Sequence, residues 1–126
     1  ALGADGFAVL GGDDATAARA MLDGTDGVIS AASNLAPGAM RHLCDLALAG
    51  RRDEALAWGA RLQPLFEFTV LEPNPIPLKA ALERLGIGHG LRLPLTPLPD
   101  VHQAAVARIT GAVEAIESSL RDPLAV

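Results

Sequence analysis

Two short apolar runs near the start of the chain restrict the possible fold more than any other feature. The first is FAVL (residues 7–10), which ends at Gly11 and Gly12, and the second is VISA (residues 28–31), which follows Gly27. Continuous apolar runs of this length are typical of strands that are covered on both faces. An Ala-rich stretch with a helical pattern separates them, and two strands joined through a helix run parallel, as a right-handed βαβ unit.

A pair of parallel strands does not make a stable sheet by itself. Both of its edges are left unpaired, and parallel sheets occur almost only where helices cover both faces of a larger assembly. The chain has 126 residues, which allows one domain at most, because a domain usually takes about 100–200 residues. The sequence begins just before the first strand and has no initiator Met. We therefore interpret it as the second part of a larger α/β protein.

The remaining sequence has the pattern of helices separated by glycines and prolines. We expect helices over residues 15–23, 37–49, 78–85 and 101–120, and one more that starts after Asp53 and passes through a kink at Pro64. Asp14 and Asp53 are candidate N-caps, and Gly24 is a suitable stop for the first helix. Pro37 suits a first helical turn.

Two proline-rich segments interrupt this pattern. The segment 72–77 (EPNPIP) should not form regular structure, because its three prolines remove three backbone donors. The segment 91–99 (LRLPLTPLP) should be extended. The last helix should bury a stripe made of Val101, Ala105, Ile109, Val113, Ile116 and Leu120, and the helix over 37–49 a face made of Met40, Leu43, Cys44 and Ala47.

Composition excludes several classes of function. The net charge is -5, the only basic pair is Arg51-Arg52, and aromatic residues make up 3% of the chain. We therefore expect neither a nucleic-acid partner nor binding to an anionic membrane. No stretch approaches the ~18 apolar residues of a membrane helix, and no secretory signal is visible. The lone Cys44 excludes an internal disulfide and fits the cytoplasm. The three histidines, His42, His89 and His102, are not spaced as metal ligands usually are, so we expect no metal site.

Four motifs occur in order along the chain: FAVLGGDD, GVISAASN followed by AP, EPNPIPLKAALERLG and LRLPLTPL. Together they resemble the C-terminal portion of the dihydrodipicolinate synthase family. That family belongs to the pyruvate-dependent class I aldolases, which include N-acetylneuraminate lyase. The resemblance covers essentially the whole chain, and four motifs in register are far more specific than any one of them.

The resemblance implies a (β/α)8 TIM barrel to which this chain contributes the last two βα units and a C-terminal helical extension. Residues 1–50 would form the two βα units, and residues 51–126 the extension. A barrel of this kind takes about 250 residues, and its active site lies in the loops at the carboxyl ends of the strands. The loops that begin at GGDD and ISAASN should therefore face the substrate.

The resemblance also implies which residues bind substrate. Gly12, Asp13 and Asp14 would line the site of the second substrate, although Asp13 and Asp14 could instead only cap the following helix, and we favour the cap for Asp14. Ile29 would contact the pyruvate carboxylate through its backbone while its side chain packs in the core. The amide of Asn74 could bond to groups at the rim of the site, or could only satisfy the backbone of its turn.

No catalytic residue is expected within the chain. The Schiff-base lysine of the family comes from the sixth strand, upstream of Ala1. Lys79, the only lysine present, lies at the start of a helix rather than at the end of a strand, so we reject it as that nucleophile. The tyrosines that relay protons in the family would also lie upstream, since the chain has no Tyr.

Three other features have structural interpretations. We expect Arg92 to anchor the C-terminal segment and Trp58 to pack against neighbouring helices or a subunit. The run Arg51-Arg52-Asp53-Glu54 should be a solvated helix start.

The resemblance implies an enzyme that condenses pyruvate with L-aspartate 4-semialdehyde through a lysine Schiff base, in lysine (diaminopimelate) biosynthesis. It would need no cofactor, and it would be a cytoplasmic dimer or tetramer. The present chain alone should be inactive. Two alternatives stay open at this point: another pyruvate-dependent lyase of the same fold that cleaves a sugar acid, or a non-catalytic helical interaction fragment.

Overall fold

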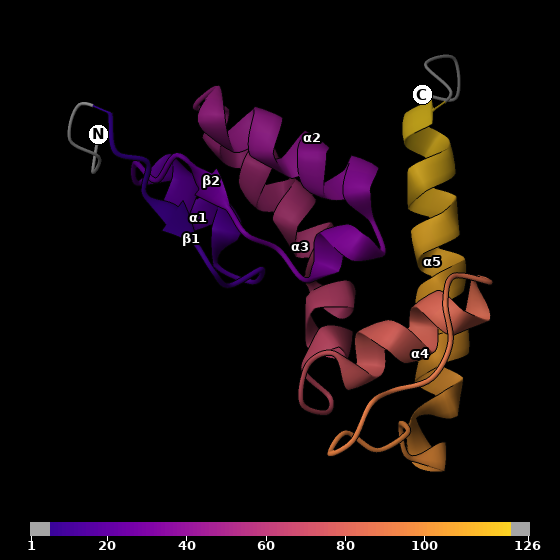
Figure 1. Ribbon diagram of the computed structural model, residues 1–126. Helices are drawn as coiled ribbons and strands as arrows, with labels where there is room; N and C mark the ends of the chain where they lie inside the picture. The colour runs from indigo at the N-terminus through magenta and orange to yellow at the C-terminus, as the bar shows by residue number, and fades with distance from the viewer. Residues whose placement is uncertain (1–5, 122–126) are drawn as a thin grey trace.

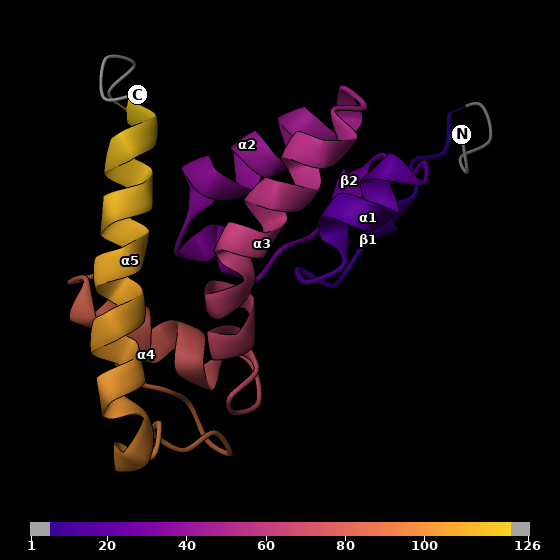
Figure 2. The same cartoon turned by 180° about the vertical axis from the view of Figure 1, so that it is seen from behind.

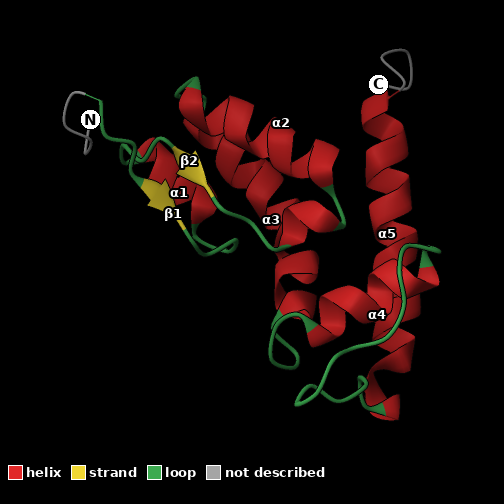
Figure 3. Cartoon of the chain, in the orientation of Figure 1, coloured by secondary structure: helices red, strands yellow, loops and turns green. Residues whose placement is uncertain are grey.

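The computed structural model describes residues 6–121, which form a small parallel sheet followed by a set of helices (Figures 1 and 3). The elements are β1 (Leu10–Gly11), α1 (Ala17–Leu22), β2 (Gly27–Val28), the 3-10 turn η1 (Ala32–Asn34), α2 (Pro37–Leu48), α3 (Arg52–Thr69), α4 (Ile76–Arg84), the 3-10 turn η2 (Asp100–His102) and α5 (Gln103–Arg121). The sheet and α1 lie at one end, α2 and α3 occupy the middle, and α4 and α5 form the other side (Figure 1).

The two strands are parallel, as the βαβ pattern predicts, with Leu10 paired with Gly27 and Gly11 with Val28. Each strand is only two residues long, which is shorter than the apolar runs predict. Asp26 extends the pairing at the amino end, because its backbone N–H donates to the carbonyl of Val9 and its carboxylate accepts from the N–H of Val9.

Within residues 6–121 the strand end of the molecule is exposed, whereas the apolar runs predict strands covered on both faces in a larger assembly. Phe7 is 72% exposed, Leu10 is 49% exposed, and the side chain predicted to pack in the core, Ile29, is 71% exposed. The physical reason is that a parallel strand is covered by neighbours on both sides and both faces. Residues 6–121 supply one strand neighbour and one crossover helix.

Helix α1 does not begin as predicted. Asp14 does not cap it; the N-cap position is Thr16, and no side chain there bonds to the helix backbone. The carboxylate of Asp14 is instead engaged with the loop after β2, so tertiary geometry takes precedence over the local capping preference. Gly24 ends the helix as predicted, with φ of 115°.

Helices α2 and α3 form the centre of the core. Pro37 opens α2 at its first turn, as predicted, and Leu43 and Leu62 are fully buried between the helices. Asp53 does not cap α3, because the helix begins one residue earlier and Arg51 holds the N-cap position. Helix α3 continues through Pro64, and its ribbon bends along its length (Figure 2).

Trp58 packs against α2, as predicted. Its ring nitrogen donates to the carbonyl of Ala39 at 3.0 Å, His42 meets the ring edge-on at 4.7 Å between centroids, and the guanidinium of Arg61 lies 4.5 Å from the ring centroid. The helix start at Arg51 and Glu54 is exposed and carries an ion pair between these two residues, in agreement with a solvated position.

The proline-rich segment is shorter than predicted, because α4 begins at Ile76 rather than at residue 78. Pro77 lies within the first turn, where no helical hydrogen bond from its nitrogen is needed, so the prediction of irregular structure at 76–77 is wrong. The segment 91–99 contains no helix or strand.

Helix α5 packs its apolar stripe against the core with two departures from the prediction. Val101 is 80% exposed and lies in η2, whereas Val106, which is outside the predicted stripe, is buried. Ile109 and Val113 are buried as predicted. No helix within residues 6–121 is long and apolar enough to cross a membrane.

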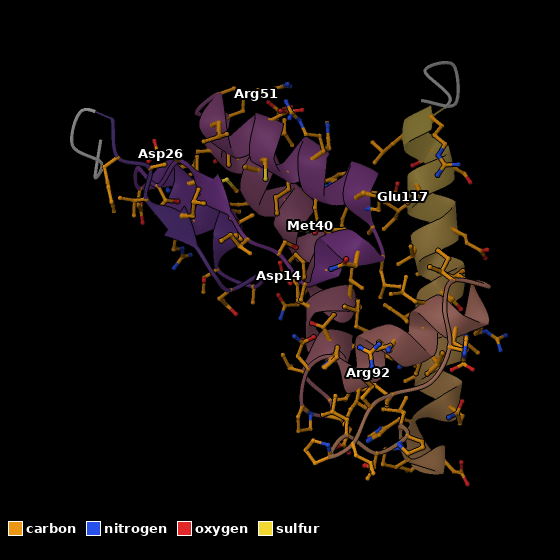
Figure 4. The ribbon with its side chains drawn as sticks, viewed as in Figure 1. Asp14, Asp26, Met40, Arg51, Arg92 and Glu117 are labelled. Atoms are coloured by element: carbon orange, nitrogen blue, oxygen red, sulfur yellow. The ribbon has the colours of Figure 1, made fainter. Side chains whose placement is uncertain are left out.

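A buried carboxylate joins α5 to the start of α2. The side chain of Glu117 is 9% exposed and accepts hydrogen bonds from the backbone N–H groups of Gly38, at 3.1 Å, and Ala39, at 2.8 Å. The first N–H groups of a helix have no partner within the helix, so Glu117 caps α2 from a distant part of the chain. Figure 4 shows Glu117 directed from α5 toward α2.

Candidate functional site

A pocket of about 320 Å³ lies at the carboxyl ends of the strands. Its wall brings together four of the five residues that the sequence predicts to bind substrate: Gly12, Asp13, Asp14 and Asn74. The first three come from the loop after β1, and Asn74 comes from the turn before α4. The far side is supplied by the second half of α3, including Gln63, Phe66 and Glu67.

Asp13 and Asp14 are adjacent, but their carboxylates bond to different parts of the structure. Asp13 accepts from Thr16 within its own loop, from the backbone N–H at 2.9 Å and from the hydroxyl at 2.6 Å. Asp14 crosses to the other strand-end loop and accepts from the N–H of Ala32 at 2.8 Å. Its second oxygen, Oδ1, is buried and has no hydrogen-bond partner among residues 6–121. Figure 4 shows Asp14 beside the central helices.

Gly12 leaves open space at the pocket wall. A Cβ added there would meet no atom within 4 Å, and its φ lies outside the left-handed region. Neither Gly11 nor Gly12 has a positive φ, so backbone conformation does not require glycine at either position. What glycine provides at position 12 is access of a ligand to the backbone.

Ile29 lies in the loop after β2 but is not among the residues that line this pocket. Its backbone N–H donates to the carbonyl of Gly11 at 2.9 Å, which extends the strand pairing by one residue. This donor is therefore already used within the sheet.

The backbone closes the turn that carries Asn74 without help from the Asn74 amide. The N–H of Ile76 donates to the carbonyl of Pro73 at 2.9 Å, and within residues 6–121 the side chain of Asn74 makes no hydrogen bond. The interpretation in which this amide only satisfies its turn is thus not supported. The amide is exposed at the pocket wall.

Sequence reasoning missed the contribution of α3. Gln63 and Glu67 are one helical turn apart, and the amide of Gln63 donates to the Glu67 carboxylate at 3.2 Å. Their spacing is common on exposed helix faces, so nothing in the local sequence distinguishes them. Only the packing of α3 beside the strand-end loop brings them to the pocket.

The charges at the pocket have one sign. Three carboxylates line it, from Asp13, Asp14 and Glu67, and no Lys, Arg or His is among its described lining residues. Such a wall favours the positively charged end of a ligand over a carboxylate or phosphate.

The other candidate residues lie away from this pocket. Lys79 is in the first turn of α4 and lines a separate hollow of about 510 Å³ between α4 and α5. The guanidinium of Arg92 is exposed and makes no ion pair or hydrogen bond within residues 6–121, so the structure does not support an anchoring role. No group of three or more His, Cys, Asp or Glu side chains in the described part of the chain could hold a metal ion.

The sequence profile of the Dihydrodipicolinate synthetase family matches residues 2–113 of the chain. A 4-hydroxy-tetrahydrodipicolinate synthase of Xanthomonas axonopodis pv. citri is 56% identical over 126 residues, which cover 99% of this chain and 42% of that protein. The crystal structure of dihydrodipicolinate synthase from Acinetobacter baumannii, described as chloride inhibited and complexed with pyruvate, superposes with a TM-score of 0.81 and 38% identity, over 86% of this chain and 38% of that one.

A further solved structure is described as the first monomeric dihydrodipicolinate synthase variant. It has a TM-score of 0.80 and 35% identity, and the match covers 86% of this chain and 36% of that one. The chain thus spans about two fifths of the length of the curated relative that it matches over 99% of its own length. Profile, sequence identity and backbone geometry agree, and the chain belongs to the dihydrodipicolinate synthetase family.

Proposed function

We propose that the full-length protein carrying this chain is a lyase-type enzyme that condenses pyruvate with L-aspartate 4-semialdehyde through a lysine Schiff base. The observation that carries this proposal is the 56% identity, over 99% of the chain, to a protein named 4-hydroxy-tetrahydrodipicolinate synthase. The proposal includes a role in lysine biosynthesis, a cytoplasmic location that fits a chain with a single cysteine, and a dimer or tetramer.

In this proposal the chain supplies the last two βα units of a (β/α)8 barrel and the helical extension that follows them. The exposed apolar side chains of Phe7, Leu10 and Ile29 support it, because neighbouring strands and helices of a barrel would cover them. The position of the pocket also supports it, since barrel enzymes bind substrate at the carboxyl ends of their strands.

The proposed chemistry divides between the chain and the remainder of the protein. A lysine outside residues 1–126 attacks the pyruvate carbonyl and loses water to give an imine, and loss of a methyl proton then gives an enamine. The enamine carbon attacks the aldehyde carbon. The amino group of the second substrate then attacks the imine carbon, which closes the ring and releases the lysine.

The chain's contribution is to bind and orient the second substrate. The ammonium group of the second substrate suits a pocket lined by carboxylates. The absence of a side chain at Gly12 allows the aldehyde end of that substrate to approach the backbone closely. Holding the two reactants in this way can lower the barrier by several kcal/mol. The pyruvate carboxylate would bind outside this acidic pocket, near Ile29.

Reductive trapping tests the proposal directly. The full-length protein is incubated with pyruvate and borohydride, digested and analysed by mass spectrometry, and turnover is measured with L-aspartate 4-semialdehyde and with N-acetylneuraminate. We expect one reduced pyruvate adduct on a lysine outside residues 1–126 and turnover of the semialdehyde only. An adduct on Lys79, or turnover of the sugar acid alone, would contradict the proposal.

A further inference from the structure

We infer that Asp14 is a positioning residue, which orients the substrate pocket by holding the loop after β2 against the loop after β1. It would act as a hydrogen-bond acceptor and not as a charge that touches the substrate. This inference rests on the proposed function, because the pocket that it orients is the one assigned above to the second substrate.

The bond that carries the inference joins two segments 18 positions apart. Oδ2 of Asp14 accepts from the backbone N–H of Ala32 at 2.8 Å. Ala32 is completely buried and is the first residue of η1, whose N-cap residue, Ala31, provides no side-chain cap. The first N–H of a helical turn has no partner within the turn. Asp14 supplies that partner from the neighbouring loop.

The residues on both sides of this bond line the pocket. Gly12, Asp13 and Ala15 flank Asp14 in the first loop, and Ala31 precedes Ala32 in the second. The bond therefore fixes the distance between two parts of the pocket wall.

Two hydrogen bonds tie the second loop internally. The N–H of Ser33 donates to the hydroxyl of Ser30 at 2.9 Å, and the hydroxyl of Ser33 donates to the carbonyl of Ser30 at 2.8 Å. Because the loop is tied internally in this way, releasing it from Asp14 would displace Ala31 together with its neighbours.

Asp13 provides a matched control within the same pocket. It is the same residue type at the adjacent position, but the two hydrogen bonds that its carboxylate accepts both come from Thr16 in its own loop. Loss of the Asp13 carboxylate removes a negative charge from the pocket without releasing the loop after β2.

The alternative is that Asp14 binds a cationic group of the substrate through Oδ1, which is buried and without a partner among residues 6–121. The two interpretations differ in what an amide would do. Asp14→Asn keeps an acceptor oxygen for Ala32 and removes the charge, whereas Asp14→Ala removes both. A positioning residue tolerates the amide, and a residue that binds a cation does not.

The experiment compares the full-length wild type with Asp14→Asn, Asp14→Ala and Asp13→Ala. Hydrogen exchange of a peptide covering residues 30–35 reports the Ala32 bond without any substrate, and steady-state kinetics with pyruvate and the semialdehyde report the pocket. We expect Asp14→Ala to lose exchange protection and about 10- to 100-fold in kcat/KM for the second substrate. Asp14→Asn should keep the protection and stay within about threefold of wild type. Asp13→Ala should keep the protection.

Two results would overturn the inference. One is Asp14→Asn falling as far as Asp14→Ala in kcat/KM while its exchange protection is kept, which would assign a direct charge contact. The other is equal protection in the wild type and Asp14→Ala. If Asp14→Ala does not fold, the Asp14→Asn comparison still decides between acceptor and charge. Failure of the proposed function is distinguishable, because it would appear as no pyruvate trapping in the wild type.

Discussion

At the scale of single residues, the space around a side chain predicts what a substitution will do. Gly12 sits at the pocket wall, where an added Cβ would have no neighbouring atom within 4 Å, and no positive φ excludes a side chain there. Cys44 lies half-buried on α2 between two charged neighbours, Arg41 and Asp45. A substitution at Gly12 should therefore affect substrate binding. Substitutions beside Cys44 should affect only the reactivity of its thiol.

We expect Gly12→Ala to impair binding without affecting folding. The added methyl group meets no protein atom, so the free energy of unfolding should change by less than about 0.5 kcal/mol. It occupies space in the pocket, so KM for the second substrate should rise about tenfold. Denaturant unfolding and steady-state kinetics measure the two effects. An unchanged KM would place the substrate elsewhere.

Two charged neighbours, Asp45 and Arg41, should have opposite effects on the reactivity of the Cys44 thiol. Burial raises the pKa of the Cys44 thiol, Asp45 raises it further, and Arg41 lowers it. Asp45→Asn should therefore lower the pKa and speed alkylation by iodoacetamide at pH 8, because more thiolate is present. Arg41→Gln should slow it. Alkylation rates that change in the same direction in both variants would rule out this electrostatic account.

At the scale of elements, the contact between α2 and α5 depends on a close approach between Glu117 and Gly38. Glu117 accepts from two N–H groups at the start of α2, and the absence of a side chain at Gly38 leaves room for this carboxylate in its present position. A Cβ at Gly38 would lie 2.7 Å from Oε2 of Glu117. The two residues therefore form one energetic unit.

We expect Gly38→Ala to destabilise the full-length protein by about 1–3 kcal/mol, through overpacking against the carboxylate. Glu117→Ala should cost about 2–3 kcal/mol, because it leaves the buried N–H of Ala39 and the partly buried N–H of Gly38 without a partner. The double variant should be far less destabilised than the sum, since the methyl group no longer meets a carboxylate. Denaturant unfolding of the three variants measures this coupling.

Gly111→Ala in α5 is the matched control for this cycle. A Cβ at that position meets nothing within 4 Å, so alanine should stabilise the helix by about 0.5–1 kcal/mol. Additive effects of Gly38→Ala and Glu117→Ala would show that the close approach does not couple them.

Prediction from sequence succeeded for elements whose signals are local and failed where a distant partner decides. The start of α2 at Pro37 and the end of α1 at Gly24 follow from backbone restrictions of proline and glycine. Asp14 and Asp53 fit the local pattern of an N-cap equally well, yet neither caps a helix. The actual cap of α2 is Glu117, 78 positions away from Ala39, and no local pattern contains it.

Some residues of the candidate site could be predicted from the sequence, and others could not. The strand-end loop with Gly12, Asp13 and Asp14 could be predicted, because the ends of parallel strands converge on barrel active sites. Gln63 and Glu67 could not, because an exposed pair on a helix face has no distinguishing sequence signal. Their place at the pocket depends on how α3 packs.

At the scale of the whole molecule, the helical end has a buried core, whereas the strand end exposes apolar side chains. The helices enclose a continuous core that includes Leu43, Leu62 and Val113. The strands at the other end expose Phe7, Leu10 and Ile29, and their outer edges have no strand partner within residues 6–121. An exposed pair of strands of this kind pairs readily with further strands.

Hydrogen exchange tests whether this end is completed in the full-length protein. We expect the backbone amides of residues 7–10 and 26–29 to be strongly protected there, because strands on both sides would pair with them, and weakly protected in the chain of residues 1–126 alone. Amides of α2 and α3 serve as the internal reference. Rapid exchange at residues 7–10 in the full-length protein would exclude the barrel placement.

The close fit between Gly38 and Glu117 also restricts how relatives of this chain can diverge. A bulkier residue at position 38 would require a shorter or redirected side chain at position 117, because a Cβ there would lie 2.7 Å from Oε2 of Glu117. Substitutions at these two positions should therefore appear together along evolutionary lineages, as a covarying pair linking α2 to α5.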